Sequence, residues 1–483
     1  MYRLRLGMCA AALLALVADG CATNPVTGRR ELSLVSSGQE LQLGQQGYTA
    51  VISEYGKYDD AALAAYVDSV GQRVARASHL PNLAWHFTVL DDPTVNAFAM
   101  PGGYIYITRG ILAHLNSEAQ LAGVLGHEIG HVTHRHTAEQ MTQQQLVGLG
   151  YTALQIGVPE LQQYDAIAQQ ALGLMFLKYS RDHETQADEL GVSYATLAGY
   201  DPHEIPSTYA MLKRVSQAAG SNIPAFMSTH PDPGDREART GQLANQAAAG
   251  KTGLKIGQRE YLRHLEGVVY GRDPREGYFD GARYVQPTLD FQIDFPAGWV
   301  TQDSRSAVMA ADGSQRGQMQ LTLAQGGDAS PAAFAQSLLS SGQAASVQGT
   351  TERIGGYDAW IGTLTVQGQG GPTRLDAAFI RVSRTTMYQF LGASAVPGDA
   401  IEHAILLSMR SFRAIEDRSR LNPVPPRVHL AQAPAAGTLQ AQIDHLGPIG
   451  IKADEIAVVN NLELDEPVMA GKTLKLVRPG STH

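Results

Sequence analysis

Apolar positions recur with a helical period through the first part of the chain. Leu63, Val67, Val70 and Val74 are three or four residues apart, which predicts an amphipathic helix with one face in a core. Asp59 and Asp60 precede this helix and are suitable N-caps. We also expect a helix that begins near Ser37.

The next segment mixes strand and helix patterns. Residues 85–90 alternate between polar and apolar types, and the turn-rich segment 96–103 leads to a second predicted strand at 104–108. If the strand at 104–108 lies at the edge of its sheet, it could pair with an extended polypeptide. Ser117 as N-cap, with Gln120 three residues later, predicts the start of a helix that continues through residues 127–131. A further helix is expected from about Asp165 to Leu197.

Beyond residue 275 the pattern changes to short strands separated by turns. Residues 291–295, 357–366, 377–382 and 387–391 are predicted strands, and 331–339 and 399–409 are predicted helices. Together they predict an α+β module at residues 285–415, for which we find no clustered catalytic set. A Pro/Ala-rich linker is expected at 416–437 and a small terminal unit at 438–483.

The N-terminal segment has the features of a signal peptide. Arg3 and Arg5 precede an apolar run from Gly7 to Val17, too short to span a bilayer. We therefore expect residues 1–20 to be a signal peptide and Cys21 to be the first residue after it, lipidated as in bacterial lipoproteins. Asp19 is unusual in such a signal, so a soluble periplasmic or secreted protein is the alternative.

Composition limits the partners. The 483 residues, 44% hydrophobic and 17% charged, indicate a soluble globular protein of several domains. A net charge of −9 argues against nucleic acid or anionic lipid as an electrostatic partner. Because the chain has no apolar run of membrane-spanning length, we expect contact with a membrane only through a lipid anchor.

The motif with the strongest chemical content is His127-Glu128-Ile129-Gly130-His131. Residues i and i+4 share one face of a helix, so the two imidazoles can bind the same metal ion. Glu128 lies about 100° further around the helix, where its carboxylate can address a water on that ion. The alternative, a chance match on a solvated helix face, is the weaker interpretation.

Zinc needs a third protein ligand. The extended metzincin motif would place Gly at position 134 and His at 137, where this chain has His134 and Thr137, so that class is excluded. Glu184 and Asp188 are i, i+4 neighbours on the next predicted helix, so one carboxylate can bind metal while the other supports it. His134 is a rival third ligand, because it also lies near the metal-facing side of its helix.

These motifs resemble one family. The His127–His131 motif, followed by Ser180-Arg181-x-x-Glu184-x-x-Ala187-Asp188, is similar to the gluzincin family of the CAAX prenyl protease and HtpX, in its soluble periplasmic BepA-like branch. Segments 96–103, 198–202 and 228–236 support the resemblance. It implies one zinc ion per chain held by His127, His131 and Glu184, with Glu128 as general base and Asp188 as an orienting residue.

The resemblance also places a loop with His230 and Arg236 near the active site. His230 is a candidate to stabilise an oxyanion or to occupy the open position of zinc and keep the enzyme latent; a structural loop histidine is the alternative. Arg236 is a candidate to neutralise developing charge or to pair with an acid on a helix. We favour the second role for Arg236.

The predicted fold class is α+β and multidomain. A mainly helical zincin-type metallopeptidase domain with a small sheet occupies residues 21–275, followed by the α+β module. The last unit resembles the second half of a LysM domain, which makes peptidoglycan a candidate partner. The predicted function is a zinc endopeptidase (EC 3.4.24 type) of the bacterial periplasm, anchored at the outer membrane through Cys21. Its expected substrates are unfolded or misassembled envelope polypeptides, cleaved by zinc-activated water; the alternative is a low-turnover, chaperone-like or peptidoglycan-tethered adaptor.

Overall fold

The computed structural model describes residues 21–152, 179–218, 226, 229–230, 233–314, 316–324, 326–368 and 371–481. The chain divides into two compact units: residues up to Arg272 together with Pro426–Pro479, and residues Asp273–Pro425 with the last residues of the chain. The predicted signal peptide, residues 1–20, lies outside the described residues. Within the described ranges, no helix combines the length and apolar character needed to cross a membrane.

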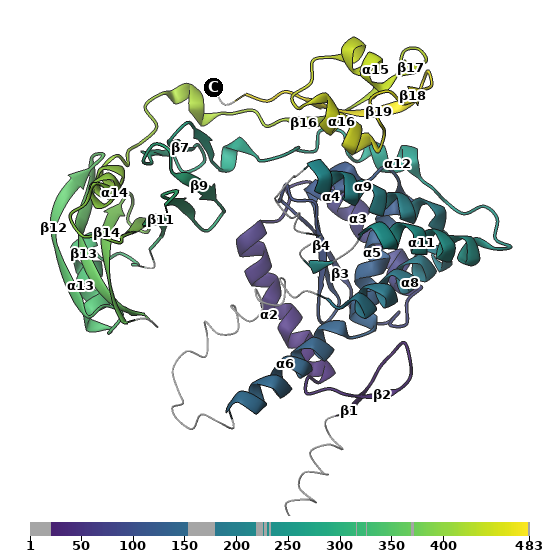
Figure 1. Cartoon of the computed structure of the whole chain (residues 1–483), viewed down its shortest axis with the longest axis horizontal. Coiled ribbons are helices and arrows are strands. Elements are labelled where there is room, and N and C mark those ends of the chain that lie inside the picture. Colours follow the sequence, from purple (N-terminus) through teal and green to yellow (C-terminus); the bar gives the residue numbers. More distant parts are fainter. Residues whose placement is uncertain are drawn as a thin grey trace, which may run out of the picture. The chain divides into compact units, whose positions relative to one another are not determined.

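The first unit contains a small sheet surrounded by helices (Figure 1). Its strands are β1 (Cys21–Thr23), β2 (Arg30–Leu32), β3 (His86–Leu90), β4 (Ala97–Met100) and β5 (Tyr104–Thr108). Its helices before residue 272 are α2 (Ser37–Tyr55), α3 (Ala61–Arg76), α4 (Arg109–His114), α5 (Glu118–Thr133), α6 (His136–Thr152), α8 (Arg181–Leu197), η1 (Pro202–Glu204), α9 (Ile205–Ala218), α11 (Pro233–Ala248) and α12 (Gln258–Arg263).

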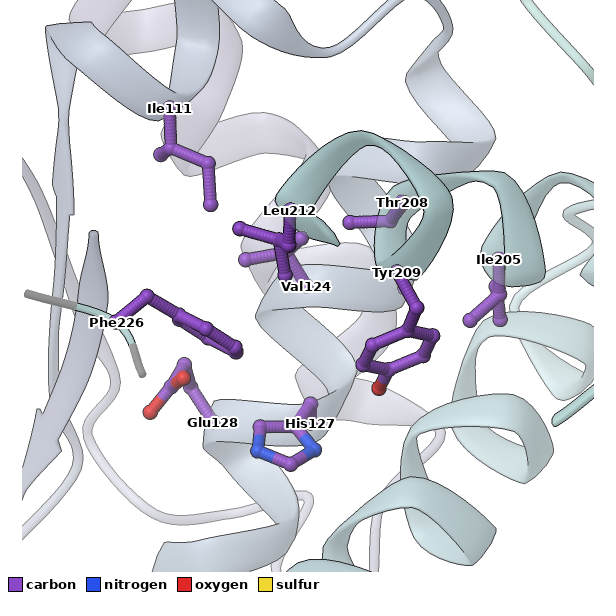
Figure 2. Close-up of a pocket in the computed structure, with 10 residues that line it drawn as sticks. Ile111, Val124, His127, Glu128, Ile205, Thr208, Tyr209, Leu212 and Phe226 are labelled. Atoms are coloured by element: carbon purple, nitrogen blue, oxygen red, sulfur yellow. The ribbon is translucent and has the colours of Figure 1, made fainter. Parts of the chain in front are cut away.

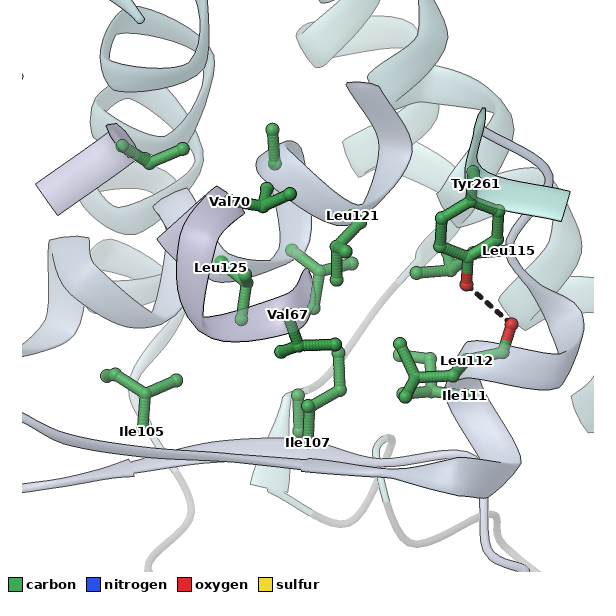
Figure 3. Packing of buried hydrophobic residues seen from close by; sticks show 14 of the residues in the cluster. Val67, Val70, Ile105, Ile107, Ile111, Leu112, Leu115, Leu121, Leu125 and Tyr261 are labelled. Carbon is green, nitrogen blue, oxygen red and sulfur yellow. Dashed lines mark hydrogen bonds between the residues drawn. The ribbon is translucent and has the colours of Figure 1, made fainter. Parts of the chain in front are cut away.

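The sheet of β3, β5 and β4 separates two apolar layers. Strand β5 lies in the middle, parallel to β3 and antiparallel to β4. Ile105 and Ile107 face the core formed with α3 and α5, and Figure 3 shows Val67, Leu121 and Leu125 above them. Tyr106 on the opposite face packs in a separate cluster with residues of α2. The expectation that 104–108 could be an edge strand is therefore wrong, because β5 lies between β3 and the preceding strand β4.

Helices α5 and α8 approach each other closely because glycine lies at the contact. A Cβ atom added to Gly191 on α8 would lie 2.9 Å from the backbone nitrogen of His127, and one added to Gly126 would lie 3.0 Å from the carbonyl oxygen of Gly191. A side chain at either position would force the helices apart. The glycines therefore allow acidic side chains of α8 to reach the histidines of α5.

The predicted starts of two helices are confirmed. Ser117 and Asp60 are N-caps whose side chains accept hydrogen bonds from backbone N–H groups of α5 and α3. Ser180, which the sequence did not indicate as a helix start, caps α8 in the same way. The predicted helix from Asp165 to Leu197 is wrong at 179–180, which are not helical. Ser180 starts a new helix there; residues 165–178 lie outside the described residues.

The C-terminal part of the first unit has two strands, then two helices, then two strands. Its elements are β16 (Arg427–Gln432), β17 (Gly437–Thr438), α15 (Leu439–Leu446), α16 (Ala453–Asn460), β18 (Pro467–Val468) and β19 (Thr473–Arg478), with β16 antiparallel to β19. The predicted linker 416–437 is thus wrong for 427–432, which form a strand. The alternation that would mark a strand is weak there, and only pairing with the distant β19 reveals it.

The second unit is a seven-stranded sheet with a helix on each face, plus a small three-stranded sheet. Its elements are η2 (Pro274–Glu276), β6 (Tyr278–Asp280), β7 (Arg283–Gln286), β8 (Phe291–Asp294), β9 (Val300–Asp303), β10 (Val308–Ala311), β11 (Gly317–Leu323), α13 (Pro331–Ser340), β12 (Ser346–Ile354), β13 (Tyr357–Gly368), β14 (Gly371–Arg381), β15 (Met387–Ser394), α14 (Ala400–Arg410) and η3 (Arg418–Leu421). Along β14, Ala377 and Phe379 pack with α13, whereas Ala378 and Ile380 pack with α14. These mixed helices and sheets, in more than one unit, agree with the predicted α+β class.

Candidate metal centre

Three buried ligand candidates from two helices meet at one point. His127 and His131 are one turn apart on α5, and their Nε2 atoms are 3.0 Å from each other. Glu184 on α8 lies with its carboxylate oxygens 3.6 Å from each of these nitrogens. All three side chains are buried. The geometry thus brings together the residues that the sequence assigned to zinc.

Hydrogen bonds leave both Nε2 atoms free to bind a metal. The Nδ1–H of His127 donates to Asp188 at 3.0 Å. His136 lies 2.9 Å from Gln186 Oε1 through its Nε2; since that oxygen only accepts, the His136 Nε2 carries the proton and its Nδ1 accepts from His131 Nδ1 at 2.9 Å. Two neutral imidazoles then point unprotonated nitrogens at each other. Such nitrogens repel unless a cation lies among them, so this donor set fits zinc.

Burial favours the neutral form of the His131 and His136 imidazoles, and a histidine must be neutral to bind a metal. Burial and the neighbouring His127 lower the pKa of His131 well below its usual value. The pKa of His136 is likewise lowered, by burial and by the rings of His183 and His134. His183 stacks on His136 with ring centroids 4.3 Å apart, and His134 does so at 4.7 Å. His136 is therefore a neutral acceptor that orients His131.

Arg236 on α11 compensates the acidic charge. Its guanidinium lies 2.7 Å from Glu184 and 2.6 Å from Asp188, and it is buried against the ring of Tyr209. Burial raises the pKa of Asp188, but Arg236 and His127 outweigh burial and hold that pKa well below its usual range. Asp188 therefore stays ionised and can orient His127. This position agrees with the interpretation that Arg236 pairs with an acid on a helix.

Glu128 differs from Asp188 in accepting no hydrogen bond from the described residues. Its side chain is fully buried, and neither carboxylate oxygen has a hydrogen-bond partner among the described residues. Burial raises its pKa, although His230 and His127 oppose that effect. A buried carboxylate with both oxygens unsatisfied has a strong tendency to take up a proton, as a general base must.

His230 lies directly against the ligand group. Its Nδ1 is 2.8 Å from Glu184 Oε1 and 3.4 Å from His127 Nε2, and its Nε2 has no partner among the described residues. One potential ligand atom from each of His127, His131, Glu184 and His230 lies within 4.8 Å of the others. The ring of Phe226 stacks on His230, with centroids 4.5 Å apart.

His134, the rival third ligand, is directed elsewhere. Its Nδ1 lies 3.2 Å from the amide nitrogen of Asn24, and its ring is only partly buried. It does not belong to the group of ligand atoms around Glu184. Of the two candidates, the geometry places Glu184 at the centre.

A small apolar pocket, with room for about one water molecule, adjoins His127 and Glu128 (Figure 2). Its walls come from α4, α5 and α9 and from Phe226. The lining residues other than His127 and Glu128 are Ile111, Gly123, Val124, Ile205, Thr208, Tyr209, Leu212 and Phe226. Sequence analysis missed this pocket, because its walls are distant in sequence and each residue looks like an ordinary core position.

Sequence analysis also missed residues that support the ligands. Gln186 fixes the protonation of His136, Tyr209 donates a hydrogen bond to Asp188 at 2.6 Å, and Tyr179 stacks on His131 at 3.9 Å between ring centroids. None of them belongs to a motif with recognisable ligand spacing. Their roles depend on contacts between separate helices.

Comparisons with known proteins agree with this centre. Residues 61–241 match the model of Peptidase family M48. The mitochondrial metalloendopeptidase OMA1 of Arabidopsis thaliana is 32% identical over 190 residues, 38% of this chain and 38% of that protein. The corresponding OMA1 of Schizosaccharomyces pombe is 32% identical over 213 residues, 43% of this chain and 61% of that protein.

A bacterial relative has similar coverage. The beta-barrel assembly-enhancing protease of Escherichia coli is 30% identical over 240 residues, 47% of this chain and 48% of that protein. The chain spans between 38% and 61% of the length of these three relatives. Residues 61–241, which match the family model, contain the histidines, acids and Arg236 of the centre described above. The chain therefore carries a zinc metallopeptidase domain of peptidase family M48.

Proposed function

We propose that the protein is a zinc-dependent endopeptidase of the bacterial cell envelope that cleaves unfolded or misassembled polypeptides. The observation that carries the proposal is the pair of unprotonated His127 and His131 nitrogens beside Glu184, next to the unpartnered carboxylate of Glu128. Three metal ligands and a free base are the set that metal-assisted peptide hydrolysis requires.

His127, His131 and Glu184 would hold the ion. Bound zinc supplies Lewis acidity, which makes water a better nucleophile and polarises the peptide carbonyl. Glu128 accepts the proton of the attacking water and returns it to the leaving amine. Asp188 and His136 keep the two imidazoles in the orientation and protonation state that the reaction needs.

Two features support an extended, unfolded substrate. Strand β4 is an edge of its sheet, and no other described strand pairs with its outer side. An extended polypeptide can hydrogen-bond to such an edge with little sequence preference. The apolar pocket beside Glu128 would accept an apolar side chain, which folded proteins bury and unfolded proteins expose.

The envelope location rests on the N-terminus. The segment from Arg3 to Val17 has the pattern of a signal peptide, and Cys21 is placed for lipidation. The name of the Escherichia coli relative connects that protein with the assembly of β-barrels, which favours an envelope substrate here as well. The pairing of β16 with β19, with helices α15 and α16 between them in the chain, supports the LysM-like assignment and peptidoglycan as a partner.

His230 is proposed to hold the enzyme latent. With its Nδ1 bound to Glu184 and its Nε2 3.9 Å from Glu128 Oε1, its ring fills space that substrate needs. The competing role is stabilisation of the oxyanion, for which the imidazole would have to donate a hydrogen bond to the reacting carbonyl oxygen.

Replacement of the proposed base tests catalysis. Glu128→Gln should retain zinc and lower casein cleavage by about 10³-fold or more, because the amide cannot accept the water proton. Casein digestion by both proteins, after their zinc contents are matched, measures this. If both proteins digest casein equally well, Glu128 is not the base. If neither protein digests casein, the result favours the low-turnover adaptor.

Metal analysis distinguishes the two candidate third ligands. Glu184→Ala should lose most bound zinc, whereas His134→Ala should retain about one ion per chain, because His134 bonds to Asn24 instead of the centre. Zinc per chain is measured by mass spectrometry after dialysis. Full zinc in Glu184→Ala together with none in His134→Ala would contradict the assignment.

Peptide turnover distinguishes the roles of His230. If His230 holds the enzyme latent, His230→Ala should raise the basal cleavage of an unstructured peptide several-fold. If His230 stabilises the oxyanion, the same change should lower kcat by about 10²-fold. Steady-state kinetics of the purified proteins decides between them, and an unchanged rate would leave a structural role only.

Lipidation is tested in cells. Cells grown with a palmitate analogue should label the wild-type protein, and Cys21→Ser should remain unlabelled, because Cys21 is the proposed attachment point. Gel fluorescence after export measures the label. An unlabelled wild type would contradict the lipid anchor and leave secretion as the explanation of the signal segment.

A further inference from the structure

The C-terminal residues 426–479 hold the end of α4 through a buried lysine. Lys475 on β19 is 1% exposed, and its Nζ donates to the carbonyl oxygens of Ala113 at 2.8 Å and Leu115 at 2.7 Å. These carbonyls belong to the last turn and the C-cap of α4. An amine at this position donates hydrogen bonds to carbonyls that the helix itself leaves free.

The same C-terminal residues hold α9 through an arginine. Arg214 donates to the carbonyl oxygen of Leu462 at 2.8 Å and lies 3.1 Å from the carboxylate of Glu463. Helix α16 packs against both α9 and α4. Helices α4 and α9 of the peptidase domain are thus both in contact with residues 426–479.

These two helices also form walls of the pocket beside Glu128. Ile111 comes from α4, and Ile205, Thr208, Tyr209 and Leu212 come from α9 (Figure 2). Ile111 is two residues before Ala113, and Leu212 is two residues before Arg214. Since a two-residue step turns a helix by about 200°, Leu212 faces the pocket while Arg214 faces the opposite side. The third wall, Val124, belongs to α5, which is fixed by its close contact with α8.

Burying the Lys475 side chain costs free energy, and hydrogen bonds offset this cost only while β19 is packed against α4. Burial lowers the pKa of the Lys475 ammonium well below its usual value. The two carbonyl oxygens of α4 replace part of its lost hydration. Displacement of β19 would leave those carbonyls without this donor and would release the end of α4.

We propose that residues 426–479 act as a brace that sets the width of the apolar pocket, with Lys475 and Arg214 as its positioning residues. This inference rests on the proposed function, in which the pocket takes an apolar side chain of an unfolded polypeptide. At the present separation of α4 and α9 from α5, the pocket has room for only a small apolar side chain. The brace therefore determines which side chain is accepted and leaves the zinc ligands on α5 and α8 unchanged.

The test compares two brace variants with two matched controls. Lys475→Met and Arg214→Gln remove the contacts, and Lys472→Met and Lys213→Gln remove positive charges from exposed neighbours. Zinc content, amide hydrogen exchange of α4 and α9, and kcat/KM are measured for two peptides. The peptides are identical except for leucine or alanine beside the scissile bond.

The wild type and both controls should prefer the alanine peptide by about 10-fold or more, because the larger leucine side chain does not fit the narrow pocket. Lys475→Met and Arg214→Gln should keep their zinc, exchange faster in α4 and α9, and lose most of this preference. A variant that loses rate equally on both peptides, or exchanges like its control, would overturn the brace.

Two further outcomes are decisive. If Lys475→Met does not fold, the Arg214→Gln variant alone tests the brace. The Arg214 side chain is partly exposed, so replacing it leaves no buried charge. If the wild type cleaves neither peptide, the proposed peptidase function fails. Hydrogen exchange then still tests the brace: faster exchange of α4 and α9 than in the controls supports it, and equal exchange contradicts it.

Discussion

The close contact between α5 and α8 is the constraint on which the metal centre depends. Gly126 and Gly191 let the two backbones approach, and this approach brings Glu184 and Asp188 to the histidines of α5. Glu184 has to reach the ligand atoms themselves, while Asp188 has to reach the far nitrogen of His127. Both distances are set by the separation of α5 and α8. If the two helices were further apart, neither Glu184 nor Asp188 would reach the histidines.

Charge balance around the centre assigns different roles to similar residues. Two of the three buried carboxylates, Glu184 and Asp188, share the guanidinium of Arg236 and stay ionised. Glu128 has no such cation in hydrogen-bonding contact, and burial raises its pKa. The three carboxylates on α5 and α8 are chemically alike but have different neighbours. Glu184 can therefore act as a ligand, Asp188 as an orienting acid and Glu128 as a base.

The pocket connects this centre with the end of the chain. Its walls belong to helices that have no role in metal binding, and two of those helices are held by residues that follow the second unit in sequence. Metal ligation and side-chain selection therefore depend on different parts of the fold. Such a separation lets substrate preference change without loss of the metal site.

The sequence alone determined the local features: the i, i+4 histidines, the acidic pair and the N-caps Asp60 and Ser117, because helix geometry fixes them over a few residues. The rest required tertiary structure. Strand order put β4 instead of β5 at the sheet edge, and pairing with β19 revealed β16 inside an apparent linker. The partners of Glu184, His230 and Lys475 are more than forty residues away in sequence. Only packing of separate elements decides which distant groups meet.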